Sequence, residues 1–291
     1  MKFLTTIFFV IFCSNVRAQN VERNAYTAPN QTERVIGAIK LIQNIRYGKV
    51  PAIVKDSISD RLLDLYLPEQ AQGEKQLPLF VFIHGGGFAG GDKGLTDLCS
   101  KIASGGFIVA SINYTLLLKY KKVKDASCSA NMAAGLPING QFHPLLKEAL
   151  LVASDDAISA LKFLKANQKK YNIDFNNVAI SGGSAGSMTA LYLTYASNQK
   201  VTKIKAVVDL WGGLENTNVI KKGAPPVLIY HGDLDKLINV DYAYALDKRM
   251  REVDSNNSDL QILKGRGHAA YKYIAQNKTA EIIGFLKANL K

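Results

Sequence analysis

Short apolar runs alternate with helix-like segments along most of this chain, and this alternation restricts the folds open to it. The clearest run covers residues 78–83 (PLFVFI), which is typical of a strand buried on both faces. Parallel neighbours require crossover connections, so the alternation predicts an α/β fold with a mainly parallel central sheet and helices on both faces. We expect strands at residues 61–67, 78–83, 107–112, 178–180, 204–210, 227–230 and 260–263, and helices at residues 94–104, 148–169, 185–197, 241–253 and 271–289.

The size of the chain suits one large domain. It has 291 residues, of which 47% are hydrophobic and 21% charged, enough apolar material for a single core. Residues 19–45 are polar and carry no clear period, so we expect an N-terminal arm there and the folded domain over residues 46–291.

The N-terminus predicts an export signal. Lys2 precedes an apolar run over residues 3–12, and the small-residue site Val16-Arg17-Ala18 follows. The run is far shorter than the roughly 20 residues of a spanning helix. We therefore expect residues 1–18 to be a signal peptide and the mature protein to be periplasmic or secreted, without a membrane span. Lipidation at Cys13 is the alternative, although Phe12 is bulky for that site.

Export changes how the cysteines and the charge are interpreted. Cys99 and Cys128 would remain in the mature chain, where an oxidising compartment permits a disulfide; two buried thiols are the alternative. Loss of Lys2 and Arg17 lowers the formal charge from +12 to +10. The lysines are scattered except at positions 119, 121, 122 and 124, and no nucleic-acid motif accompanies them, so we expect no nucleic-acid partner.

Residues 115–147 show no sustained period and contain this lysine cluster together with several glycines and prolines. Loops of this length in compact domains are usually functional or mobile. We interpret the segment as a lid-like insertion near a substrate entrance; the alternative is a surface excursion without a role in binding.

Residues 182–186 (GGSAG) carry the strongest chemical signal. They follow a predicted strand and open a predicted helix, the setting of a nucleophile elbow, in which a strained turn presents a serine. Glycines at such a turn prevent clashes with the neighbouring backbone. We therefore predict Ser184 as a nucleophile.

Residues 84–88 (HGGGF) directly follow another predicted strand. Glycines let backbone N–H groups face a substrate oxygen, and acyl transfer needs such donors for the developing oxyanion. Gly86, Gly87 and Ala185 are the predicted oxyanion-hole donors, although the pattern does not single out two of the three glycines. We expect His84 to organise the loop through hydrogen bonds.

A serine nucleophile needs a base and an acid that orients it. His268 lies in a Gly-rich loop between the last predicted strand and the C-terminal helix, so it is the predicted base; we expect His143 to pack in a loop and His231 to shape the acid loop. Asp233 and Asp235 both follow the strand at 227–230. Asp235 is preferred as the acid because the chain has by then turned off the sheet.

From about residue 50 onward the chain resembles α/β-hydrolase carboxylesterases with an H-G-G-G oxyanion loop, the group that includes hormone-sensitive-lipase-like and bacterial feruloyl or acetylxylan esterases. The matching segments are residues 84–88, 91–93, 182–186, 231–235 and 267–268. The resemblance implies the α/β-hydrolase fold, the order Ser184, Asp235, His268, and hydrolysis of a small-molecule or glycan-linked ester through an acyl-enzyme, without metal or cofactor. The chain lacks a long N-terminal cap and has Gly183 in place of the acidic residue of the lipase-like form, which favours the feruloyl-esterase-like branch.

Three other functions remain open. An amidase or formamidase would use the same three residues on a different bond. An exopeptidase is disfavoured because no propeller accompanies the domain. A binding protein on a hydrolase scaffold would be expected to have lost part of this machinery, and all of it is present in the sequence.

Overall fold

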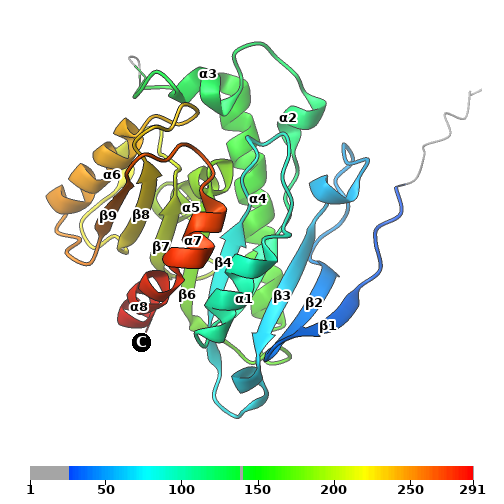
Figure 1. Ribbon diagram of the computed structural model, residues 1–291. Coiled ribbons are helices and arrows are strands. Elements are labelled where there is room, and N and C mark those ends of the chain that lie inside the picture. Colours follow the sequence, from blue (N-terminus) through cyan, green and yellow to red (C-terminus); the bar gives the residue numbers. More distant parts are fainter. Residues whose placement is uncertain (1–25, 138–139, 291) are drawn as a thin grey trace, which may run out of the picture.

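A nine-stranded sheet runs through the part of the chain that the computed structural model describes, residues 26–137 and 140–290 (Figure 1). Its order is β1-β2-β3-β5-β4-β6-β7-β8-β9. Strands β4 to β9 pair in parallel, while β1, β2 and β3 pair antiparallel with their neighbours. The strands are β1 Thr32–Ile36, β2 Ile39–Arg46, β3 Leu62–Pro68, β4 Leu77–Ile83, β5 Ile108–Ile112, β6 Ile173–Gly183, β7 Ile204–Leu210, β8 Val227–Gly232 and β9 Asp259–Leu263. The predicted α/β fold is confirmed.

Helices cover both faces of the sheet. One face packs against α1 (Thr96–Ser104), α7 (Tyr271–Asn277) and α8 (Thr279–Asn289), and the other against α4 (Pro144–Ala166), α5 (Ala185–Tyr195) and α6 (Asp241–Glu252). Successive side chains of a strand point to opposite faces, so Phe80 and Phe82 enter the first core and Val81 the second. A strand buried on both faces explains the uninterrupted apolar run at this position.

The N-terminal arm differs from the expectation. Within residues 19–45, the described part holds β1 and most of β2, which extend the sheet as an antiparallel hairpin. Two features hide these strands in the sequence: most of β1 is exposed, and β2 bulges between Ile42 and Ile45, where Asn44 has φ +59°. The bulge interrupts the two-residue alternation that marks a strand.

The predicted signal peptide lies outside the described residues. No described helix combines the length and apolarity needed to cross a bilayer.

The segment 115–147 contains two short helices, α2 (Leu117–Tyr120) and α3 (Cys128–Met132), and the first turn of α4. Helix α4 starts earlier than expected because Pro144 occupies its first turn and His143 caps it, with Nδ1 accepting from the N–H of Leu145 (3.1 Å). Short 3₁₀ turns also occur at Ser57–Ser59, Glu69–Gln72 and Thr217–Val219.

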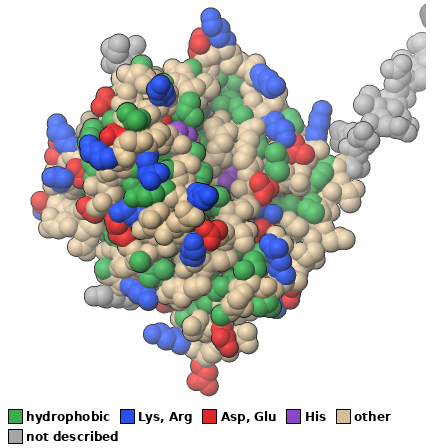
Figure 2. Space-filling view, in the orientation of Figure 1, with side chains coloured by type: hydrophobic (Ala, Val, Ile, Leu, Met, Phe, Trp, Pro, Cys, Tyr) green, Lys and Arg blue, Asp and Glu red, His purple; other side chains and the backbone are tan. Residues whose placement is uncertain are grey.

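Charges are mixed over the surface. Lys119 pairs with Asp56 and Lys121 with Glu148, so part of the lysine cluster is neutralised locally. On the face shown in Figure 2, basic and acidic side chains are interspersed.

Cys99 and Cys128 are both free and buried, so the disulfide that the sequence permitted does not form between them. Cys99 packs on the α1 face of the sheet, whereas Cys128 packs on the opposite face, with Sγ 3.8 Å from Sδ of Met188. Burial raises the pKa of each thiol to about 12. The alternative of two buried thiols describes them correctly.

Candidate active site

Ser184 stands at a strained turn between β6 and α5. Its backbone has φ +55° and ψ −122°, a region that non-glycine residues rarely adopt. A hydrogen bond from the N–H of Ser184 to the carbonyl oxygen of Leu210 (2.9 Å) stabilises the turn. A Cβ on Gly182 would lie 2.3 Å from the backbone carbon of Gly186, so the glycine there is a steric requirement. The predicted strand-turn-helix setting is therefore present around Ser184.

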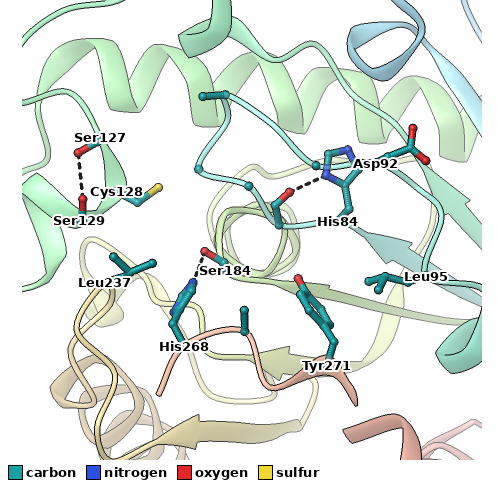
Figure 3. A pocket seen from close by; sticks show the side chains of 16 residues that line it. His84, Asp92, Leu95, Ser127, Cys128, Ser129, Ser184, Leu237, His268 and Tyr271 are labelled. Atoms are coloured by element: carbon teal, nitrogen blue, oxygen red, sulfur yellow. Dashed lines mark hydrogen bonds between the residues drawn. The ribbon is translucent and has the colours of Figure 1, made fainter. Parts of the chain in front are cut away.

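His268 and Asp235 complete a hydrogen-bonded chain with Ser184 (Figure 3). His268 Nε2 lies 2.8 Å from Ser184 Oγ, and His268 Nδ1 lies 2.6 Å from Asp235 Oδ2. The carboxylate accepts from Nδ1–H, which leaves Nε2 free to accept the serine proton. The structure thus brings together the three residues selected from the sequence, from the ends of β6 and β8 and the loop after β9.

Asp235 is buried but well supplied with donors. Burial opposes its ionisation, yet hydrogen bonds from His231, His268 and two backbone N–H groups hold its pKa well below the ordinary value. Those N–H groups belong to Leu237 and Ile238, at 2.8 and 3.0 Å from Oδ1. The carboxylate is therefore ionised at neutral pH. Asp233, the rejected candidate, accepts instead from the N–H of Gly265 (2.7 Å).

The glycine loop after β4 folds back on itself beside the nucleophile. Gly86 has φ +118° and Gly87 has φ +62°. The carbonyl of Gly86 accepts from the N–H groups of Ala89 (3.0 Å) and Gly90 (2.9 Å), which fixes the turn. Gly86 and Gly87 line the pocket that contains Ser184, and Ala185 begins α5 directly after the nucleophile. This arrangement puts all three predicted oxyanion donors near the serine.

His84 lies under this loop. Its ring stacks on Tyr114 with centroids 4.5 Å apart, and its Nδ1 lies 2.6 Å from the carbonyl oxygen of Gly85. A carbonyl only accepts, so Nδ1 carries a proton. Burial lowers the pKa of His84 to about 4, so the ring is neutral. These contacts are those of a loop-organising residue. His231 contacts Asp235, with Nε2 3.3 Å from Oδ2.

A pocket of about 580 Å³ surrounds the serine. Figure 3 shows Ser184 and His268 at its centre, with Leu237 and helix α3 on one side and Tyr271, Leu95 and Asp92 on the other. Cys128 and the hydroxyl-bearing neighbours Ser127 and Ser129 form the α3 wall. Three residues of the segment 115–147 therefore line this pocket. Among the described residues, no group of three or more His, Cys, Asp or Glu side chains could hold a metal ion.

Sequence reasoning missed several pocket residues. Tyr271 begins α7 three residues after His268, and its hydroxyl packs against Gly183, where an added Cβ would lie 1.9 Å away. Its spacing from the predicted base could have indicated it. Leu237 follows Asp235 by two residues and could have been found the same way. Cys128 and Leu95 lie far from the motifs along the chain, and only the folded structure brings them to the pocket.

Known proteins are similar to this chain in sequence and in fold. A family model described as phospholipase/carboxylesterase matches residues 70–289. The chain is 24% identical over 273 residues to esterase LipC of Mycobacterium tuberculosis, covering 84% of this chain and 64% of that protein. It therefore spans less than two thirds of that relative's length.

Two solved structures show the same fold. Esterase 2 of Thermogutta terrifontis, phosphonylated by cyclosarin, is 18% identical with a TM-score of 0.61 and covers 90% of this chain and 95% of its own. A truncated carbohydrate esterase from gut microbiota is 17% identical with a TM-score of 0.58 and covers 86% of this chain and 95% of its own.

Proposed function

Since the chain belongs to the phospholipase/carboxylesterase family, we propose that it is a serine esterase that hydrolyses carboxylic esters through an acyl-enzyme. The observation that carries the proposal is the hydrogen-bonded chain from Ser184 Oγ through His268 to Asp235. Ser184 and His268 line a pocket that the glycine loop also borders. A nucleophile, a base and the residue that orients the base are the minimum for acyl transfer.

In the first half-reaction, Ser184 Oγ attacks the ester carbonyl carbon while His268 Nε2 takes the hydroxyl proton. Asp235, which stays ionised, stabilises the imidazolium that forms. The tetrahedral intermediate collapses when His268 gives that proton to the leaving alcohol oxygen. The alcohol leaves, and the acyl group remains on Ser184.

The negative charge on the former carbonyl oxygen needs fixed donors. The N–H groups of Gly86, Gly87 and Ala185 are the candidates, because the loop and the helix start both border Ser184. Removing one such donor typically costs roughly 3–4 kcal/mol of transition-state stabilisation. In the second half-reaction, His268 removes a proton from water, and the oxygen of that water attacks the acyl carbon. The bond between Ser184 Oγ and the acyl carbon then breaks, His268 returns the proton to Oγ, and the acid leaves.

The pocket supports a small or carbohydrate-linked ester as the substrate. Its volume of about 580 Å³ suits a short acyl group with a modest alcohol. Ser127 and Ser129 on one side and Asp92 on the other offer polar groups to a hydroxylated alcohol. The likeness to a carbohydrate esterase agrees with this choice.

We also propose export of the protein, on the basis of the signal-like residues 1–18.

The test is hydrolysis of 4-nitrophenyl esters of rising chain length, with methyl ferulate and acetylated xylan, by the chain from Gln19 onward. We expect turnover of short esters by the wild type and none by Ser184→Ala. A preference for ferulate or acetylxylan would identify the substrate branch. If the folded wild type hydrolyses none of these esters but cleaves a matched anilide, the protein is an amidase and not an esterase.

A further inference from the structure

A buried ion pair lies at the far end of the glycine loop, and neither of its residues takes part in the mechanism above. Lys93 follows that loop along the chain, and Asp64 belongs to β3. Lys93 Nζ is 3.1 Å from Asp64 Oδ1, and the two side chains are 8% and 2% exposed. Burial of charged groups is costly unless they are paired and hydrogen-bonded. A lysine buried at this position therefore needs a physical explanation.

Lys93 is held through its backbone as well as through its side chain. Its N–H donates to Oδ1 of Asn113 (2.7 Å), and its carbonyl oxygen accepts from the hydroxyl of Ser111 (2.8 Å). Ser111 is the residue of β5 that pairs with Asp64 of β3. The chain that leaves the glycine loop is thus bound at three points to β3, to β5 and to the residue that follows β5.

The bulge of β2 supports the carboxylate of this pair. Asp64 lies opposite the bulge, between the two β3 residues that pair with β2 on either side of it. Asn44 within the bulge has φ +59°, and its N–H donates to Oδ1 of Asp64 (2.9 Å). Strand β3 lies between β2 and β5 in the sheet (Figure 1). The N-terminal hairpin is therefore connected through Asp64 to the end of the glycine loop.

Close backbone packing connects Lys93 to the predicted oxyanion donors. A Cβ added to Gly91 would lie 2.1 Å from the carbonyl oxygen of Gly85, so these two backbone segments are in contact. The N–H of Gly90 donates to the carbonyl oxygen of Gly86 (2.9 Å). The residues just before Lys93 therefore pack on the part of the loop that carries the donors, and a shift at Lys93 would displace that part.

We propose that Lys93 and Asp64 are positioning residues, whose ion pair holds the glycine loop where its N–H groups can bind the oxyanion. They touch neither the substrate nor the reacting atoms and act through the loop. Oxyanion donors are effective only at hydrogen-bond distance from the oxygen as its charge develops, so a displaced loop weakens binding of the transition state more than binding of the substrate. The proposal rests on the proposed esterase function, to which the oxyanion belongs.

The first test is Lys93→Met in the full mature chain, which keeps an apolar stem and removes the ammonium. We expect kcat and kcat/KM for 4-nitrophenyl acetate to fall together by about 30-fold, with KM within about twofold of the wild type. Such a pattern marks an interaction made only in the transition state. A rise in KM with kcat unchanged would overturn the proposal.

Arg46→Met is the matched control. Arg46 lies on β2 and also pairs with a buried carboxylate, that of Asp60 (2.7 Å), and its other hydrogen bond is to the carbonyl of Gly48 rather than to the glycine loop. We expect Arg46→Met to lower the melting temperature and to leave kcat within about twofold. If Arg46→Met and Lys93→Met lowered kcat equally, the Lys93 pair would stabilise the fold alone, and its positioning role would be wrong.

Asp64→Asn tests the pair from the other side, and it decides the proposal if Lys93→Met does not fold. The amide oxygen can still accept from the N–H of Asn44, so the change removes the charge and keeps the shape. We expect kcat to fall by about 10-fold at unchanged KM. The double variant should be no less active than the less active single variant, because the two residues act as one unit. Losses that multiply in the double variant would overturn the pairing.

Amide hydrogen exchange gives a readout that does not depend on activity. We expect Lys93→Met and Asp64→Asn to speed exchange in peptides that cover residues 84–93, and Arg46→Met to leave exchange there unchanged. Unchanged exchange over residues 84–93 in the first two variants would overturn the anchoring of the loop. If the wild type hydrolyses no ester, the proposed function fails, while hydrogen exchange still decides whether the ion pair holds the loop.

Discussion

Gly186 packs directly on the carbonyl oxygen of Ile83, where an added Cβ would lie only 2.0 Å away. The contact joins the helix that begins after the nucleophile to the end of β4, from which the glycine loop starts. We expect Gly186→Ala to separate the two motifs, to lower stability by about 2 kcal/mol or more, and to reduce kcat/KM strongly. Chemical denaturation and ester hydrolysis measure the two effects.

Gly284 provides the control for that substitution. It lies in α8, and a Cβ there would meet nothing within 4 Å. Alanine at this position should leave activity unchanged and raise stability by about 1 kcal/mol, because glycine is a poor helix former. If Gly186→Ala behaved like Gly284→Ala, the elbow and the glycine loop would not depend on this contact.

The low pKa of Asp235 links stability to pH. A carboxyl whose folded pKa lies below its unfolded value, about 3.9, contributes stability above that pH and loses it as the pH falls. We therefore expect Asp235→Asn to lower the melting temperature at pH 7 and to lower it less near pH 3. Activity should fall by roughly 10⁴-fold, because the amide no longer holds the correct tautomer of His268. An equal shift in melting temperature at both pH values would contradict the linkage.

The fold could be predicted from sequence where burial is two-sided and the elements are regular. Strand β4 has a continuous apolar run because both of its faces are covered, and its side chains divide between two cores. The sequence does not predict β1 and β2, because most side chains of β1 are exposed and β2 contains a bulge. Both features remove the alternation of apolar and polar residues on which strand prediction depends. The sequence pattern places Pro144 in an irregular segment, whereas in the structure this residue begins α4.

The candidate site also has residues that the sequence predicts and residues that it does not. Ser184 and the glycine loop could be found because turn strain and close backbone approach restrict the residue types allowed there. The choice of Asp235 over Asp233 needed only the position of the turn. The walls of the pocket involve contacts between residues remote in sequence, which no local pattern encodes.

The cysteines give a chemical test of the two-core arrangement. Cys99 and Cys128 are buried on opposite faces of the sheet, and burial raises the pKa of both thiols to about 12. We expect a thiol reagent to react with neither in the folded mature chain and with both after denaturation without reductant. A count of zero thiols in the denatured, unreduced protein would show a disulfide and contradict the described packing.

Leu237 and Leu234 form a matched pair for testing the pocket wall. Both are exposed on the acid loop, at 46% and 59%, but of the two only Leu237 lines the pocket around Ser184. We expect Leu237→Trp to narrow the pocket and lower kcat/KM for hexanoate relative to acetate by about 10-fold, which is the size of effect that a changed apolar fit produces. Leu234→Trp adds the same bulk outside the pocket and should leave that ratio within about twofold. The ratio is measured with 4-nitrophenyl esters, since the shared leaving group removes differences in alcohol binding. Equal effects of the two substitutions would mean that the acyl group does not lie against Leu237, and would direct the search to the Tyr271 side of the serine.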